Sequence, residues 1–355
     1  MPNVRCFSYI LRFTFPAGTS RGIMNTHRTH FITVEDEHRR GIGECAPLPG
    51  LSVDARPDFA EQLSKVAHAV AESSLPTREE DRDALLQAIP TSLPAVRFGV
   101  ETAWRDWLYG GERVLYPFAM RPAFVPVPIN GLVWMDSADR MRQQIDEKLA
   151  AGFTCLKLKI GAIDFDEELR LLDYVRQYYG PETITLRVDA NGAFSPEEAP
   201  RKLQQLARYD LHSIEQPIAP GQWEAMARLC RESPVPIALD EELIGVTGRE
   251  EKEALLDQLR PPYIILKPTL IGGLAAADEW VALAEKRNIG WWATSALESN
   301  VGLNAIAQWV ATYAPALPQG LGTGQLYHNN LDSPLHIDRG HLTYLPDREW
   351  DLSLF

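Results

Sequence analysis

The chain has 355 residues, of which 45% are hydrophobic and 23% are charged, and its formal net charge is -13. This length fits two domains or one large barrel with an addition, and it allows a large buried core. The negative charge argues against nucleic acid and against anionic membrane surfaces as partners. It does not exclude a small carboxylate substrate, because a local cluster of lysines can oppose the overall sign.

The four cysteines are scattered along the chain, and no two of them form a Cys-x-x-Cys pair. This spacing favours neither a zinc site nor a disulfide framework, and it is typical of small buried side chains in a reducing compartment. No apolar run is long enough to span a bilayer, and the start of the chain does not resemble a signal peptide. We therefore expect a cytoplasmic protein, and the sequence leaves its oligomeric state open.

The first 122 residues are predicted to form an α+β domain. Residues 4–15, 29–35 and 41–45 have the composition of strands, and hydrophobic residues recur at helical spacing between residues 57 and 110. A segment rich in small and polar residues, about 17–26, separates the first two strands. We expect this segment to be a loop that closes over a substrate as a lid, with disorder as the alternative.

From residue 125 onward, strand-like and helical segments alternate, which predicts β/α units around a parallel sheet. Their repeat of roughly 25 to 30 residues is that of a (β/α)8 barrel. A doubly wound sheet is not favoured, because no Gly-x-Gly-x-x-Gly follows an early strand. The expected strands are residues 125–130, 154–160, 183–189, 211–215, 236–240, 263–267, 290–295 and 320–322.

Acidic residues end three consecutive strands of this predicted barrel, namely Asp189, Glu215 and Asp240. An ionised carboxylate is costly to bury unless it is paired or binds a metal. The carboxyl ends of barrel strands form the catalytic face, so the three groups are expected to meet there. Three oxygen ligands with open positions suit Mg²⁺, with Mn²⁺ as the alternative. The sequence therefore predicts a metal site.

Lysines lie on the strands at either side of this acidic group. Lys157 and Lys159 share one face of the second strand, and Lys267 ends the sixth. An isolated Lys-x-Lys is more typical of a solvated sheet edge. In an eight-stranded ring, however, the second and sixth strands face each other, so Lys159 and Lys267 would flank a substrate. Lys159 is the predicted base, and the charge of Lys157 would lower its pKa.

Together these motifs resemble the enolase superfamily, muconate-lactonizing subgroup, whose signature is a Lys-x-Lys strand, an Asp/Glu/Asp metal triad and an opposing lysine. Residues 41–50, 189–192, 214–217 and 240–241 extend the resemblance over nearly the whole chain. It implies an α/β fold of modified TIM barrel type, (β/α)7β, at residues 123–326. An N-terminal α+β capping domain would comprise residues 1–122, and the C-terminal tail, residues 327–355, would pack back on the cap.

Residues 294–303 and 307–309 are similar to the o-succinylbenzoate synthases of this subgroup. The resemblance implies a lyase reaction of menaquinone biosynthesis, the Mg²⁺-dependent dehydration of 2-succinyl-6-hydroxy-2,4-cyclohexadiene-1-carboxylate through an enediolate. Lys159 would remove the α-proton and assist the departing hydroxyl, while Lys267 would lie over the ring as a cation–π partner. The alternatives are an N-acylamino-acid racemase, another epimerase or cycloisomerase, and a non-catalytic barrel.

Substrate contacts are expected at the strand tips and in the lid. Dipeptide epimerases of the subgroup carry Asp-x-Asp after the eighth strand, whereas residues 321–324 here read Leu-Gly-Thr-Gly. A small neutral tip suits a succinyl carboxylate, through backbone N–H groups and hydroxyls. We expect Asn191 and Glu241 to support the metal ligands. The expected substrate contacts are Ser295, Gly322, Thr323, Thr19, Arg21 and Met24.

Overall fold

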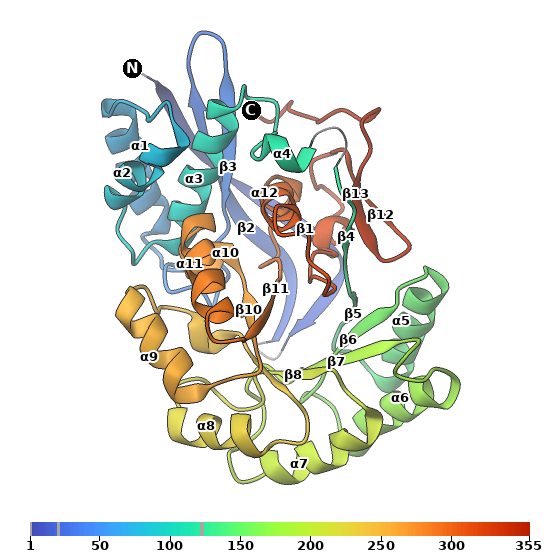
Figure 1. Cartoon of the computed structure of the whole chain (residues 1–355). Coiled ribbons are helices and arrows are strands. Elements are labelled where there is room, and N and C mark those ends of the chain that lie inside the picture. Colours follow the sequence, from blue (N-terminus) through green and yellow to red (C-terminus); the bar gives the residue numbers. More distant parts are fainter. Residues whose placement is uncertain (1, 20–21, 121–123) are drawn as a thin grey trace.

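The computed structural model describes residues 2–19, 22–120 and 124–355, which form a small antiparallel sheet and a larger curled parallel sheet, each with its own helices (Figure 1). The small sheet has the strand order β1-β2-β3. Leu63, Val66 and Val70 recur at helical spacing and are buried in the core of this part. Its elements are β1 (Asn3–Thr19), β2 (Gly22–Glu35), β3 (Arg40–Cys45), α1 (Phe59–Glu72), α2 (Arg82–Gln87), α3 (Pro94–Leu108) and α4 (Pro117–Met120).

The predicted loop at residues 17–26 is wrong for residues 17–19 and 22–26, which belong to the paired strands β1 and β2, whereas residues 20 and 21 lie outside the described residues. Ala17 pairs with Met24, and Gly18 pairs with Ile23, after a shift of register. A Cβ atom on Gly18 would lie 2.2 Å from the carbonyl oxygen of Met135 in the barrel. The small residues of this segment therefore allow a close approach between the hairpin and the barrel, where the sequence suggested an irregular lid.

The larger sheet is parallel, with the strand order β11-β10-β9-β8-β7-β6-β5. Its strands are β5 (Gly131–Val133), β6 (Cys155–Lys159), β7 (Thr185–Asp189), β8 (Ser213–Glu215), β9 (Ile237–Leu239), β10 (Tyr263–Leu266) and β11 (Gly290–Ala293). Leu156 and Leu158 of β6 lie in the main core. Their side chains alternate with those of Lys157 and Lys159 on the other face of the strand.

Helices follow these strands along the chain and lie outside the curled sheet (Figure 1). The modified barrel with an α+β cap that the sequence predicted is confirmed. The helices are α5 (Ala138–Ala150), α6 (Phe165–Tyr178), α7 (Ala199–Leu206), α8 (Trp223–Glu232), α9 (Arg249–Leu259), α10 (Pro268–Ile271), α11 (Leu274–Glu285) and α12 (Asn300–Ala311).

Two of the predicted barrel strands differ from the structure. Residues 125–130 contain only the short β4 (Val127–Pro128), and the first strand of the parallel sheet begins later, at Gly131. Proline has no N–H to donate to a ladder, and Pro126 and Pro128 limit pairing there. Residues 320–322 are no strand either. Single parallel bridges, Ile129 with Gln319 and Thr294 with Gly320, join this segment to its neighbours.

The C-terminal tail contacts both parts of the molecule. β12 (Leu335–Asp338) and β13 (His341–Tyr344) form a hairpin, and β13 pairs with β4. Beyond this hairpin the ring of Phe355 packs on that of Phe31 in β2, with centroids 5.1 Å apart. The predicted domain boundary after residue 122 lies outside the described residues.

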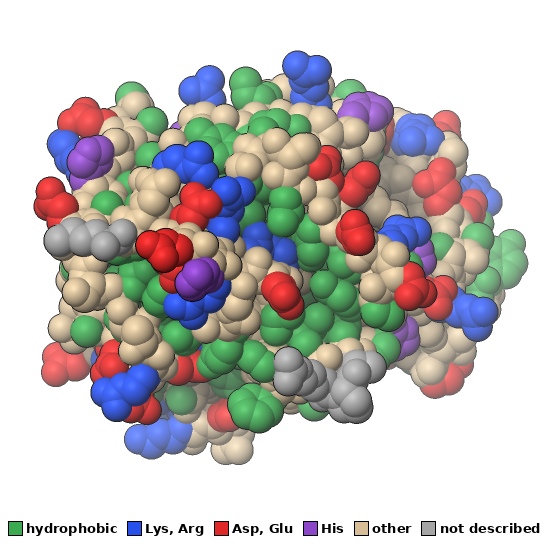
Figure 2. Space-filling model, turned by 90° about the horizontal axis from the view of Figure 1, so that it is seen from above, with side chains coloured by type: hydrophobic (Ala, Val, Ile, Leu, Met, Phe, Trp, Pro, Cys, Tyr) green, Lys and Arg blue, Asp and Glu red, His purple; other side chains and the backbone are tan. Residues whose placement is uncertain are grey.

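The surface carries both signs of charge. On the face seen in Figure 2, acidic and basic side chains are interspersed around a broad hydrophobic area. Among the described helices, none is both long and apolar enough to cross a membrane.

A buried histidine makes the stability of the fold depend on pH. His27 in β2 is 1% exposed, and burial lowers its pKa to about 4, with His30 acting in the same direction. The unfolded chain therefore binds a proton at this site before the folded protein does, so stability falls as the pH drops from 6.5 toward 4. We expect His27 alone to cost about 2 kcal/mol of unfolding free energy between pH 7 and pH 5.

Urea unfolding at both pH values measures this loss. His27→Leu should flatten the pH dependence, whereas His38→Leu, which changes an exposed histidine in the β2–β3 turn, should retain it. Equal slopes in both variants would refute the assignment.

Candidate active site

The barrel strands bring the predicted lysines and carboxylates to one edge of the sheet. Lys159 ends β6, Asp189 ends β7 and Glu215 ends β8, and the three are register neighbours on adjacent strands. Asp240 directly follows β9, and Lys267 directly follows β10. Because parallel strands all end on the same side, the five groups meet at the mouth of the barrel.

Two ammonium groups from β6 converge on the first carboxylate. Lys157 Nζ donates to Asp189 Oδ2 at 3.2 Å and to Glu215 Oε2 at 2.7 Å. Lys159 Nζ donates to the same Asp189 oxygen at 3.1 Å and to Asn191 Oδ1 at 2.7 Å. Both lysines therefore point into the barrel, as the alternation along the strand predicts.

Lys267 approaches the carboxylates from another strand. Its Nζ donates to Asp240 Oδ2 and lies 3.7 Å from Glu215 Oε1. On the other side, Asn191 Nδ2 donates to Glu241 Oε1 at 3.0 Å. The predicted supporting residues, Asn191 and Glu241, thus belong to the same network.

Burial and charge pairing act against each other in this network. Desolvation disfavours the charged form of Lys157, but Glu215 and Asp189 outweigh it and raise the lysine's pKa. Asp240 and Glu215 likewise outweigh desolvation and raise the pKa of Lys267. Lys159 and Lys157 hold the pKa of Asp189 below its usual range despite burial. Lys157 is therefore a fixed positive charge beside Lys159.

The remaining carboxylates bear the cost of burial. Desolvation, followed by the negative charge of Asp189, raises the pKa of Glu215 to about 7. Desolvation also raises the pKa of Asp240, although Lys267 opposes it. Glu215 and Asp240 therefore take up a proton more readily than carboxyl groups in water do.

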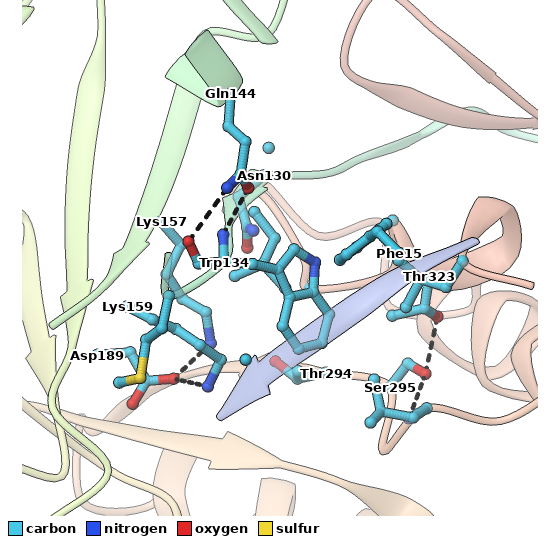
Figure 3. A pocket seen from close by; sticks show the side chains of 18 of the residues that line it. Phe15, Asn130, Trp134, Gln144, Lys157, Lys159, Asp189, Thr294, Ser295 and Thr323 are labelled. Atoms are coloured by element: carbon cyan, nitrogen blue, oxygen red, sulfur yellow. Dashed lines mark hydrogen bonds and ion pairs between the residues drawn. The ribbon is translucent and has the colours of Figure 1, made fainter. Parts of the chain in front are cut away.

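These charged groups form one end of a cavity of about 910 Å³. Lys157, Lys159, Asp189, Asn191 and Lys267 line that end. In Figure 3, the ammonium groups of Lys157 and Lys159 point toward Asp189. A ligand in the cavity can thus reach the ammonium groups on β6 and the one that directly follows β10.

Another part of the cavity lining is aromatic. Phe15 from β1 and Trp134 after β5 meet edge to face, with ring centroids 5.8 Å apart. Gln144 of α5 fixes the Trp134 backbone by accepting its N–H at 2.8 Å. Beyond the indole, Thr323 Oγ1 donates to Ser295 Oγ at 2.8 Å (Figure 3). The cavity therefore combines a charged end with an apolar flank and a hydroxyl pair.

The predicted substrate contacts fall into two groups. Ser295, Gly322, Thr323 and Met24 line the cavity. Arg21 lies outside the described residues, and for Thr19 only the backbone is described, which pairs with Gly22.

Several cavity residues escaped sequence reasoning. Asn130 and Thr294 line the cavity and lie next to its strand ends, so their position was the only available signal. Phe15 lies on a strand that the sequence assigned to the capping domain, so it was not expected beside the barrel site. Trp134 follows a strand whose position was misjudged, and no local pattern pointed to it.

The acidic group has the chemistry of a site for a divalent cation. Glu215 Oε1 is buried and has no hydrogen-bond partner among the described residues, and carboxylates from the two neighbouring strands flank it. As the side chains stand, Lys157 and Lys267 lie between these carboxylates, and no three metal-ligating side chains of the described chain converge on one point. The donor set fits Mg²⁺, provided that the ammonium groups move away from the carboxylate oxygens.

Residues 140–349 match the family model described as enolase C-terminal domain-like. The chain is also 47% identical to an o-succinylbenzoate synthase from Desulfotalea psychrophila, over 94% of this chain and 96% of that protein. This chain belongs to the o-succinylbenzoate synthase family of the enolase superfamily.

Solved structures agree with this membership. The crystal structure of MenC from Desulfotalea psychrophila has a TM-score of 0.86 and 42% identity, and the match covers 96% of this chain and 99% of that chain. A dipeptide epimerase from Enterococcus faecalis, solved with Mg and L-Leu-L-Tyr, has a TM-score of 0.83 at 19% identity, covering 98% of this chain and 97% of that chain. The second likeness concerns the fold alone.

The charge network predicts a specific cost for removing its central cation. Lys157→Met leaves Glu215 and Asp189 short of a buried counter-charge, so we expect it to lower the unfolding free energy by about 3 to 5 kcal/mol. Lys252→Met, which removes a buried lysine paired with the partly exposed Glu279, is the control and should cost less. Denaturant unfolding with and without Mg²⁺ measures both effects.

Added Mg²⁺ should restore more stability to the Lys157 variant than to the Lys252 variant, because a cation at the carboxylates replaces the lost charge. Equal losses in the two variants, unaffected by Mg²⁺, would contradict this account of the cluster.

Proposed function

We propose that the chain is an o-succinylbenzoate synthase, a hydro-lyase that converts 2-succinyl-6-hydroxy-2,4-cyclohexadiene-1-carboxylate to o-succinylbenzoate. The observation that carries the proposal is that Lys159 and Lys267, from different strands, line one cavity beside three carboxylates. The 47% identity to a relative with this name supports the choice within the superfamily.

The residues of the chain divide the reaction between them. Lys159 takes the α-proton, and Lys157, which its carboxylate partners hold protonated, remains a fixed positive charge beside it. Lys159 then returns the proton to the departing hydroxyl on the same face, so that water leaves and the ring becomes aromatic. Lys267 remains a cation above the ring, and the β1–β2 hairpin with Trp134 excludes water.

Asp189, Glu215 and Asp240 would hold the divalent cation on which enzymes of this superfamily depend. When bound, Mg²⁺ supplies positive charge that stabilises the substrate carboxylate as the α-proton is lost. Asn191 keeps Lys159 in place through its 2.7 Å hydrogen bond and is itself held by Glu241.

Lys159→Ala tests the assignment of the base. Without its amine the α-proton has no acceptor, so kcat should fall by at least about 10³-fold. Calorimetric titration with Mg²⁺ should show affinity close to that of the wild type, because the three carboxylates remain. Near-normal turnover by the variant would show that another group is the base.

The substrate itself is tested with a panel of acids. The purified protein should dehydrate the cyclohexadiene acid in Mg²⁺ and lose this activity in chelator, measured by the absorbance of the aromatic product. N-acyl amino acids and dipeptides complete the panel, because two lysines lining one cavity also suit a racemase. Racemisation without dehydration would overturn the proposed function, and full activity in chelator would overturn the metal assignment.

A further inference from the structure

The loop after β11 (residues 295–299, called the β11 loop below) forms a wall of the cavity away from the metal-binding carboxylates. Ser295, Ala296 and Leu297 line the cavity. Leu297 has a φ of 69°, in the left-handed region, which costs a residue with a side chain roughly 1 to 2 kcal/mol. Such a conformation persists only where the surroundings hold it, so the contacts behind the loop determine the shape of this wall.

Glu298 holds the β11 loop from within the barrel. Its side chain is fully buried and accepts hydrogen bonds from the hydroxyls of Ser295 and Thr269. Ser295 Oγ in turn accepts from Thr323 Oγ1 at 2.8 Å and from the Leu297 N–H at 3.1 Å. One carboxylate thus ties together the segments after β10 and β11, and through Ser295 it is linked to Thr323.

Glu44 holds the same loop from the cap. Glu44 is the penultimate residue of β3 and is fully buried. Its carboxylate accepts hydrogen bonds from the Ser299 N–H at 2.9 Å, the Ser299 hydroxyl at 2.6 Å and the Gly302 N–H at 2.9 Å. Thr29 Oγ1 of β2 donates to it at 2.8 Å. The cap therefore supplies a negative group at the N-terminus of α12, directly after the β11 loop.

The buried carboxylates of Glu44 and Glu298 lie close together, which disfavours their charged forms. Burial raises the pKa of Glu44 to about 7, and the charge of Glu298 adds to the effect. A Cβ on Gly302 would lie 2.7 Å from Glu298 Cβ and 3.0 Å from Glu44 Oε2, so glycine leaves room for both. All the hydrogen-bond donors named for the two groups are neutral. An apolar pair would fill this space without the desolvation cost, which points to a role beyond packing.

We infer that Glu44 and Glu298 are positioning residues that set the shape of the substrate-binding wall, with Glu44 carrying the placement of the cap to the cavity. They act through the β11 loop and do not touch the lysines or the carboxylates of the metal site in any contact described above. The inference rests on the proposed function, because it concerns the part of the substrate that lies away from the reacting carbon. We therefore expect a change at Glu44 or Glu298 to weaken substrate binding more than it slows proton transfer.

Glu44→Gln and Glu298→Gln test this role, because both replacements keep the shape of the side chain. In Glu44→Gln the amide NH₂ meets a backbone N–H in either orientation, that of Ser299 or that of Gly302, so the β11 loop loses at least one of its anchoring hydrogen bonds. We expect KM for the cyclohexadiene acid to rise about tenfold and kcat to change less than about threefold in each variant. The unfolding midpoint and the Mg²⁺ affinity should stay close to those of the wild type.

Glu101→Gln is the matched control. Glu101 is also a buried cap carboxylate at a barrel helix, and it accepts the N–H groups of Leu274 and Ala275 at the start of α11. None of these three residues is among those described as lining the cavity. Its replacement should leave KM unchanged, which separates a general effect on the cap–barrel contact from an effect on the β11 loop.

Unchanged KM in both loop variants would overturn the inference, as would a rise in KM that matches a loss of stability or appears equally in Glu101→Gln. Failure of the wild type to dehydrate the cyclohexadiene acid would instead overturn the proposed function. The three variants are then compared on whichever acid of the panel the wild type turns over, and the same two outcomes decide the inference.

Discussion

Balanced charge inside the barrel is the constraint on which the rest of the structure depends. Three ammonium groups and three carboxylates are buried together at the ends of five strands, and each group is tolerated only because an opposite charge lies within hydrogen-bond reach. The outward faces of the same strands are apolar and pack on the surrounding helices, which keeps the strands in register. The barrel thus supplies the close-packed scaffold that holds this charge cluster in place.

The cap is joined to the barrel by the same kind of interaction. Two of its buried carboxylates, Glu101 and Glu44, accept the free N–H groups that begin α11 and α12. Helix N-termini carry partial positive charge and unsatisfied donors, so a carboxylate satisfies both at once. The position of the cap is therefore specified by directional hydrogen bonds as well as by apolar contact, and one of these anchors lies directly behind the cavity wall.

The cavity divides its tasks between its two ends. In the proposed function, the charged end would supply the base, the opposing cation and the carboxylates for a divalent ion. The other end offers the rings of Phe15 and Trp134 and the hydroxyls of Ser295 and Thr323, which suit recognition rather than proton transfer. A fold does not determine a reaction, so in the proposed function the choice of substrate rests mainly on the second end.

The sequence by itself determined the barrel, its cap and the convergence of Lys159, Asp189 and Glu215. A repeating strand–helix period, together with the common direction of parallel strands, is enough to place strand-end residues side by side. Only the tertiary structure decided the β1–β2 hairpin and the aromatic wall. It also decided the contact of Glu44 with Ser299, two residues that lie 255 positions apart. Gly18 resembles a loop residue until the barrel carbonyl that it approaches is known. A contact between distant segments produces no periodic pattern in the sequence. Each segment has the pattern of its own strand, helix or loop whether or not its partner is present.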